Sequence, residues 1–262
     1  MKVVLFCGGM GMRMRDYSED IPKPLVPVGY RPILWHVMKY YAHFGHKEFI
    51  LCLGYKADVI KKYFLNYDEC LSNDFVLTKG GDRLDLLTSD IQDWKITFVD
   101  TGLHSNIGMR LKAVQSYVQD DEMFLANYTD GVTDLPLNAH IDRFRESGKV
   151  GAFAAVAPIQ SFHVVAMEED DATVKSINHL TRSGLWINGG YFVFRPEIFD
   201  YIEEGDELVE APFQRLIERK QLLAHRYEGF WANMDTFKDK RMLEELFFQG
   251  KAPWQLWSGH GG

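Results

Sequence analysis

Short apolar runs alternate with helix-like segments through the first 145 residues, and this alternation leaves few possible folds. The strand-like runs lie at residues 3–7, 49–53, 94–99 and 123–126, and the helix-like segments at residues 33–44, 58–63, 110–118 and 137–145. Strands that are apolar at nearly every position are buried on both faces, so we predict an α/β fold with a mostly parallel sheet covered by helices on both faces. Ligands of such sheets bind outside the carboxyl ends of the strands, where Gly8, Asp100 and Asp130 fall. We therefore expect one crevice to collect these residues.

The second half of the chain has a different pattern. Short strands with little helix between them are expected at residues 150–157, 164–167, 174–177 and 190–194, and helical spacing returns at residues 213–220 and 237–247. We interpret this part as a small β-rich extension, mixed or antiparallel, that carries a second substrate. A chain of 262 residues is long enough for one domain with a full core, and residues 258–262 are expected to form a flexible tail.

Composition excludes several classes of function. The net charge is −8 and the cations are scattered, which argues against a nucleic-acid-binding protein. The apolar runs are too short for a signal-peptide core or a membrane span. Cys7, Cys52 and Cys70 lack the spacing of a metal site or a disulfide framework. We expect a cytoplasmic protein that does not bind membranes.

The first strand-like run ends in a glycine-rich loop, Gly8-Gly9-Met10-Gly11-Met12-Arg13, and Lys23 follows between two prolines. Glycines leave backbone N–H groups open to phosphate oxygens, and Arg13 and Lys23 add two cations. The spacing matches neither the dinucleotide-binding fingerprint nor the Walker-type loop. We interpret it as a long, irregular phosphate loop with its lysine at the far end; the alternative is a turn after an edge strand.

Two further carboxylates could hold a divalent cation. Asp130 follows an apolar strand, and Asp235 precedes a helix-like segment. Two carboxylates at strand ends supply the hard oxygen ligands that Mg²⁺ needs when it bridges phosphate groups. The structural alternatives are an Asx-turn for Asp130, a helix N-cap for Asp235, an exposed loop position for Lys23 and a solvated helix position for Arg110.

Motifs spread over nearly the whole chain resemble those of the sugar-1-phosphate nucleotidyltransferases, and most closely the glucose-1-phosphate cytidylyltransferases. They are the Gly8–Arg13 loop, Lys23-Pro24, Arg31-Pro32-Ile33-Leu34-Trp35-His36, Leu53-Gly54-Tyr55-Lys56, Val99-Asp100-Thr101-Gly102, Asp130-Gly131-Val132, Ile187-Asn188-Gly189-Gly190, Gly229-Phe230-Trp231, Met234-Asp235-Thr236 and Gly250-Lys251-Ala252-Pro253-Trp254. The resemblance implies a single Rossmann-like nucleotidyltransferase domain over residues 1–257. Residues 1–135 would mainly bind nucleotide and residues 150–235 mainly the acceptor.

The resemblance also implies the reaction and the site. CTP and glucose 1-phosphate would give CDP-glucose and pyrophosphate with Mg²⁺ as cofactor, in a homo-oligomer. Arg13 and Lys23 would be catalytic, and Asp130 and Asp235 would hold the metal. The implied nucleotide-binding residues are Gly8, Gly9, Met10, Gly11, Met12, Arg13, Ser105, Arg110 and Thr129, and the implied acceptor-binding residues are Arg182, Asn188, Gly189 and Trp231.

Three departures from the family pattern bear on function. Met12 stands where the loop usually has Thr, and Thr129 replaces the first Gly of Gly-Asp-Gly. The family's Glu-Lys-Pro, whose lysine serves the sugar phosphate, is absent from the matching residues 176–182, which leaves Lys175 and Arg182 as candidate substitutes. Two alternatives therefore stand beside the leading hypothesis. One is the same chemistry on another sugar phosphate, or on a non-sugar phosphate or phosphonate; the other is a nucleotide-binding regulatory paralogue without turnover.

Overall fold

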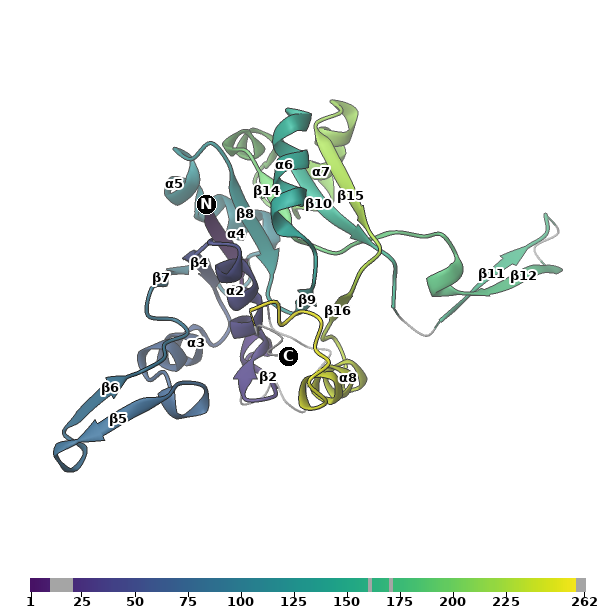
Figure 1. The fold of residues 1–262 in the computed structure, drawn as a ribbon. Helices are drawn as coiled ribbons and strands as arrows, with labels where there is room; N and C mark the ends of the chain where they lie inside the picture. Colours follow the sequence, from purple (N-terminus) through teal and green to yellow (C-terminus); the bar gives the residue numbers. More distant parts are fainter. Residues whose placement is uncertain (10–20, 160–161, 170–171, 258–262) are drawn as a thin grey trace.

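A central mixed sheet organises the molecule (Figure 1). The computed structural model describes residues 1–9, 21–159, 162–169 and 172–257, and within these residues the sheet has eight strands. Their order is β13-β10-β14-β8-β1-β4-β7, with β15 also paired to β10. The strands are β1 (Lys2–Phe6), β4 (Glu48–Leu53), β7 (Lys95–Asp100), β8 (Phe124–Tyr128), β10 (Gly151–Val156), β13 (Ile187–Asn188), β14 (Phe192–Phe194) and β15 (Leu222–Tyr227).

Most neighbours in this sheet are parallel, as the apolar runs predict. β1 pairs in parallel with β4 and β8, β4 with β7, and β10 with β15. β14 runs antiparallel to both β8 and β10, so β8 and β10 point the same way. The carboxyl ends of β1, β8, β10 and β15 consequently meet at one edge of the sheet.

Helices cover both faces. They are α2 (Ile33–His43), α3 (Ala57–Leu65), α4 (Ile107–Ala113), α5 (Gln115–Val118), α6 (Leu137–Ser147), α7 (Ala211–Glu218) and α8 (Phe237–Phe248). Alternate side chains of β1 pack into two separate hydrophobic cores, because successive side chains of a strand point to opposite faces. Val3 and Leu5 pack with α2 and α6, whereas Val4 and Phe6 pack with α4 and α7.

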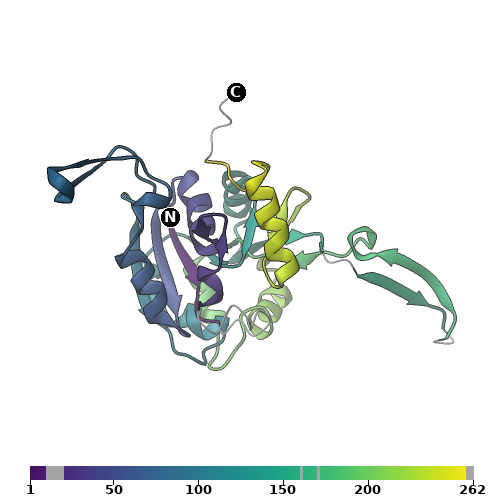
Figure 2. The same cartoon turned by 90° about the horizontal axis from the view of Figure 1, so that it is seen from below.

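Within the described residues, four two-stranded ladders stand outside the main sheet. They are β2 (Pro27–Val28) with β3 (Arg31–Pro32), β5 (Phe75–Thr78) with β6 (Arg83–Leu86), β9 (Gly131–Thr133) with β16 (Trp231–Asn233), and β11 (His163–Met167) with β12 (Val174–His179). The β5–β6 and β11–β12 hairpins project from the body on opposite sides (Figures 1 and 2). The sequence patterns predicted no element between residues 64 and 93, where β5 and β6 lie.

Two predicted elements are interrupted. The helix expected over residues 110–118 is split at Val114, whose φ and ψ of −104° and 9° are not helical, into α4 and α5. The strand expected over residues 190–194 begins only at Phe192, because Gly190 and Tyr191 both have positive φ, at 77° and 52°. Left-handed backbone cannot continue a β-ladder.

The C-terminal segment is part of the core. Trp254 is fully buried, its ring stacks on Phe230, and its Nε1 donates a hydrogen bond to Nδ1 of His36 at 3.3 Å. Nε2 of His36 donates in turn to the carbonyl oxygen of Val28 at 2.9 Å. Burial lowers the pKa of His36 to about 4, so this imidazole is neutral at physiological pH. The neutral His36 ring links Trp254 of the C-terminal segment to α2 through a hydrogen bond.

Candidate active site

The small β9–β16 ladder brings two distant aspartates to the carboxyl edge of the sheet. Gly131 pairs with Asn233, and the backbone N–H of Met234 donates to the carbonyl oxygen of Asp130 at 2.8 Å. Asp130 therefore lies opposite Met234, one residue from Asp235. Antiparallel pairing thus fixes the two carboxylates near each other, although more than a hundred residues separate them in sequence.

Lys23 lies between these carboxylates. Its Nζ is 2.6 Å from Oδ2 of Asp130 and 2.6 Å from Oδ1 of Asp235. The lysine side chain is 15% exposed, and the two aspartates are 30% and 27% exposed. Burial alone would lower the pKa of Lys23, but the adjacent carboxylates outweigh burial and raise it, so the ammonium stays charged. The structure brings together the three side chains singled out from the sequence.

This arrangement contradicts two of the structural alternatives. Lys23 begins a short 3₁₀ turn, Lys23–Leu25, after Pro22, and its side chain turns inward rather than to solvent. Asp235 is not the N-cap of α8, because Thr236 caps that helix in a capping box with Asp239. The Asp235 carboxylate instead accepts hydrogen bonds from Lys23 and from Nδ2 of Asn233.

The donor set fits a magnesium ion that is completed by substrate. Among the described residues, no group of three or more His, Cys, Asp or Glu side chains could hold a metal. Mg²⁺ in phosphoryl-transfer sites is commonly bound by one or two carboxylates, with phosphate oxygens and water completing the octahedron. Two partly exposed carboxylates that already attract a cation match that pattern, and Asp130 and Asp235 are the residues that would hold the ion.

Gly8 and Gly9 continue from β1 toward this edge. Gly8 is buried, and a Cβ placed on it would overlap the guanidinium of Arg110. Gly9 is exposed, and a Cβ there would meet nothing within 4 Å. Gly8 is therefore required by packing, whereas Gly9 leaves its backbone open. Met10, Gly11, Met12 and Arg13 lie outside the described residues, and their roles stay predictions.

Arg110 lies beneath the loop as a buried cation. The side chain is 2% exposed and donates to the carbonyl oxygens of Gly8 at 3.0 Å and Leu53 at 3.1 Å, and to Oγ1 of Thr101 at 2.8 Å. These acceptors come from the ends of β1, β4 and β7. The alternative of a solvated helix residue is wrong. The guanidinium adds fixed positive charge beneath Gly8. Its N–H donors, however, are already bonded to the carbonyl oxygens of Gly8 and Leu53 and to the hydroxyl of Thr101.

Two other predicted nucleotide-binding residues also bond to backbone. Ser105 Oγ donates to the carbonyl oxygen of Thr101 at 2.5 Å, just before Asn106, the N-cap of α4. Thr129 is buried, and its Oγ1 donates to the carbonyl oxygen of Phe6 at 3.1 Å. The Thr129 hydroxyl therefore joins β8 to β1 where the family pattern has glycine.

Three of the predicted acceptor-binding residues form one connected group at the end of β8. Trp231 Nε1 donates to the carbonyl oxygen of Gly189 at 2.9 Å. Asn188 Oδ1 accepts from the Gly190 N–H at 2.9 Å, while its Nδ2 lies 3.4 Å from the hydroxyl of Tyr128. The fourth, Arg182, ends a 3₁₀ turn, and its side chain lies outside the described residues.

Tyr191, which no sequence pattern singled out, supports the turn that carries Asp130. Its hydroxyl donates to the carbonyl oxygen of Gly131 at 3.0 Å, and its N–H donates to Oδ1 of Asn127 at 2.9 Å. A buried non-glycine residue with φ of 52° is uncommon, and such strain persists only where surrounding contacts hold it. The preceding glycine pair was the available signal of unusual backbone.

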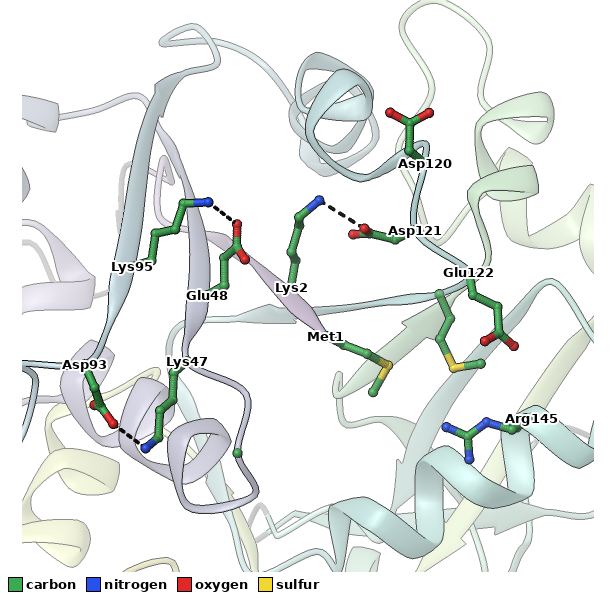
Figure 3. Close-up of a pocket in the computed structure, with 12 residues that line it drawn as sticks. Met1, Lys2, Lys47, Glu48, Asp93, Lys95, Asp120, Asp121, Glu122 and Arg145 are labelled. Atoms are coloured by element: carbon green, nitrogen blue, oxygen red, sulfur yellow. Dashed lines mark hydrogen bonds and ion pairs between the residues drawn. The ribbon is translucent and has the colours of Figure 1, made fainter.

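A hollow of about 740 Å³ lies at the opposite edge, beside the first residues of β1, β4 and β7 (Figure 3). Its charges are largely paired with each other. Lys2 contacts Asp121 at 3.0 Å, Lys95 contacts Glu48 at 2.7 Å, and Lys47 pairs with Asp93. A ligand would have to displace these pairs, and we assign no site there.

Comparison with known proteins identifies the family of this chain. The family model described as nucleotidyl transferase matches residues 2–241. The chain is 40% identical to glucose-1-phosphate cytidylyltransferase of Salmonella typhi over 98% of this chain and 100% of the relative. It is 36% identical to a probable glucose-1-phosphate cytidylyltransferase of Bacillus subtilis, with the same coverage.

Solved structures share the fold. HddC from Yersinia pseudotuberculosis, complexed with GMP-PN, superposes with a TM-score of 0.66 at 21% identity, covering 94% of this chain and 99% of the other. The family model and the full-length relatives lead to the same assignment. This chain is a member of the nucleotidyl transferase family.

Proposed function

We propose that the protein catalyses Mg²⁺-dependent transfer of a cytidylyl group from CTP to glucose 1-phosphate, releasing pyrophosphate. The full-length relatives support the choice of CTP and glucose 1-phosphate, because their names state this activity. The observation that supports this chemistry is the position of the Lys23 ammonium, which lies between the carboxylates of Asp130 and Asp235 at the carboxyl edge of the sheet. A paired-carboxylate site beside a lysine suits phosphate groups bound through a divalent cation.

The reaction requires no covalent enzyme intermediate. A phosphate oxygen of the acceptor forms a bond to the α-phosphorus of the nucleotide, the bond from that phosphorus to the bridging oxygen breaks, and its electron pair leaves with pyrophosphate. Bound Mg²⁺ would supply charge neutralisation and orient the phosphate oxygens. Lys23 places a protonated ammonium where negative charge develops, and Gly9 leaves backbone open at the same edge.

A different acceptor is the second candidate. Residues 176–179 of the segment that lacks Glu-Lys-Pro belong to β12, on the hairpin that projects from the body (Figure 2). Lys175 on that strand lies 3.8 Å from Glu168 and is thus already beside a carboxylate. The acceptor half therefore differs from the family pattern in the segment whose lysine, by the resemblance, would serve the sugar phosphate.

Pyrophosphate release tests both candidates. Wild-type protein is assayed with each nucleoside triphosphate against glucose 1-phosphate, other sugar 1-phosphates and phosphonates, with Mg²⁺ and with a chelator. We expect release with CTP and glucose 1-phosphate, and none with chelator. Release only with another acceptor would replace glucose 1-phosphate but retain the chemistry. No release with any pair would favour the regulatory paralogue.

A variant of the site and a matched control variant test whether the activity depends on these carboxylates. Asp235→Asn should lose activity, because one carboxylate that would hold the metal becomes neutral. Asp93→Asn is the matched control, since Asp93 is paired with Lys47 at the opposite edge of the sheet. Equal activity of the two variants would contradict the proposed site.

We also propose self-association through the projecting β11–β12 hairpin. On the β11–β12 hairpin, Val165 pairs with Ile177 on one face, and both are exposed together with Met167 and Val174. A lone two-stranded ribbon is marginally stable, and a cluster of exposed apolar side chains favours a covering partner. Light scattering should show an oligomer for wild type and smaller species for a Val165→Lys/Ile177→Lys variant.

No helix in the described parts of the chain has the length and apolarity of a membrane span.

A further inference from the structure

A row of residues runs from the candidate active site across the sheet. Ala155 of β10 is in register with Asn188 of β13 on one side and with Arg226 of β15 on the other. Asn188 reaches the hydroxyl of Tyr128, which lies two residues before Asp130. Side chains in direct register project to the same face of a sheet. Asn188 and Arg226 therefore flank the small side chain of Ala155 on one face, near the carboxyl ends of β8, β10 and β15.

Arg226 is an oriented cation with no carboxylate partner among the described residues. Its guanidinium lies over the ring of Trp186, 5.5 Å from the ring centre, and the side chain is exposed. It forms no ion pair with any residue that the structure describes. Arg145 and Arg241, which are also exposed, are paired with acidic neighbours on their own helices. A guanidinium supported by an aromatic face keeps its donors directed outward, which suits recognition of an oxygen-rich ligand.

The position of Arg226 suits the far end of the acceptor. Three strand spacings separate β8 from β15, about 14 Å from Tyr128 to Arg226. An acceptor whose phosphate lies at Asp130 and Lys23 would extend along this row, over Asn188 and Ala155, toward the arginine. Its phosphate would then be served by Lys23 and the metal carboxylates, and its opposite end by Arg226.

We propose that Arg226, supported by Trp186, binds the end of the phosphorylated acceptor farthest from its phosphate. It thereby selects acceptors that carry a carboxylate or hydroxyl group there. This inference rests on the proposed function and deepens it. Arg226 thus offers the acceptor a cation on the sheet itself, separate from Lys175 on the projecting β11–β12 hairpin.

Steady-state kinetics with two acceptors test the inference. Wild type, Arg226→Ala and Arg226→Lys are compared with glucose 1-phosphate and with glucuronic acid 1-phosphate, which has a carboxylate at the distal carbon. We expect Arg226→Ala to raise the KM for acceptor about tenfold, the effect of losing one charge-assisted hydrogen bond. The preference for the carboxylate over the hydroxyl should fall, while kcat and the KM for CTP change less than about twofold. Arg226→Lys should restore part of the preference.

Arg219→Ala is the matched control. Arg219 is also exposed and also lies over an aromatic ring, that of Tyr201 at 5.2 Å, but on another part of the surface. Its removal should leave the KM for acceptor unchanged. Equal kinetic constants for wild type and Arg226→Ala with both acceptors would overturn the inference.

Direct binding separates failure of this inference from failure of the proposed function. Calorimetry measures the Kd of each sugar phosphate for wild type and Arg226→Ala, in the presence of a non-hydrolysable CTP analogue. If wild type releases no pyrophosphate but binds a sugar phosphate more tightly than Arg226→Ala does, the proposed turnover fails and the role of Arg226 stands. Equal affinities, or no binding by either protein, would reject that role.

Discussion

Removal of the Lys23 ammonium should expose the repulsion between Asp130 and Asp235. Each carboxylate oxygen lies 2.6 Å from the same nitrogen, so the two oxygens are no more than twice that distance apart. Two like charges about 5 Å apart repel by about 3 kcal/mol at the effective dielectric constant of a partly buried site. Lys23→Ala also loses two charge-assisted hydrogen bonds. We expect the variant to be about 2–4 kcal/mol less stable at pH 7, a decrease in Tm of roughly 5–10 °C.

The same reasoning predicts a specific rescue. Without the ammonium, a divalent cation is the best available counter-charge for the two carboxylates, so Mg²⁺ should raise the Tm of Lys23→Ala by several degrees more than that of wild type. Turnover should still fall at least about 100-fold, because the variant lacks the cation that we propose to meet the phosphate groups. Thermal unfolding is measured with and without Mg²⁺, and pyrophosphate release is measured in parallel.

Lys47→Ala serves as the control for these measurements. Lys47 pairs with Asp93, but both side chains are substantially exposed, so the pair should contribute at most about 1 kcal/mol. Mg²⁺ should affect that variant as it affects wild type. If Mg²⁺ stabilised Lys23→Ala and wild type equally, the reasoning that the aspartates form one cation site would be refuted.

Three further predictions follow from the packing. Gly8→Ala should destabilise the protein by about 1–3 kcal/mol and abolish activity, because a Cβ there overlaps Arg110, whereas Gly9→Ala meets nothing within 4 Å and should keep wild-type stability in urea unfolding. Burial lowers the pKa of His36 from 6.5 to about 4, so between these pH values the unfolded state binds more protons and the protein becomes less stable as pH falls. His36 should account for about 3 kcal/mol of the lost stability by pH 4. A His36→Gln variant that loses as much stability over this range as wild type would contradict this. Tyr191→Phe and Tyr40→Phe each remove a buried phenol-to-carbonyl hydrogen bond and should cost about 1–2 kcal/mol, but only Tyr191→Phe, which frees the carbonyl of Gly131, should raise the Mg²⁺ concentration needed for half-maximal activity.

The sheet and the central charged trio could be predicted because their signals are local or cumulative. Apolar runs such as residues 49–53 reveal a buried strand by composition alone, and they occur at the observed positions of β1, β4, β7 and β8. Asp130, Asp235 and Lys23 carry specific motif signals. Because parallel strands share a carboxyl edge, strand order alone places Asp130 at the correct end of the sheet.

Other features depend on contacts that no local pattern records. Arg110 has an ordinary helical context, and its burial follows from carbonyl groups at the ends of three strands that only the folded chain brings together. Tyr191 adopts left-handed backbone because Asn127 and Gly131 hold it from another strand and turn. Arg226 gains its position from strand register, which a single residue in sequence does not reveal.

The pairing of β9 with β16 has a consequence for biosynthesis. Asp235 is translated more than a hundred residues after Asp130, and Trp254, which bonds to His36 of α2, is translated later still. A nascent chain on the ribosome, or a prematurely terminated product, therefore cannot assemble the two-acid centre. Formation of the Asp130–Asp235 pair is coupled to translation beyond Asp235.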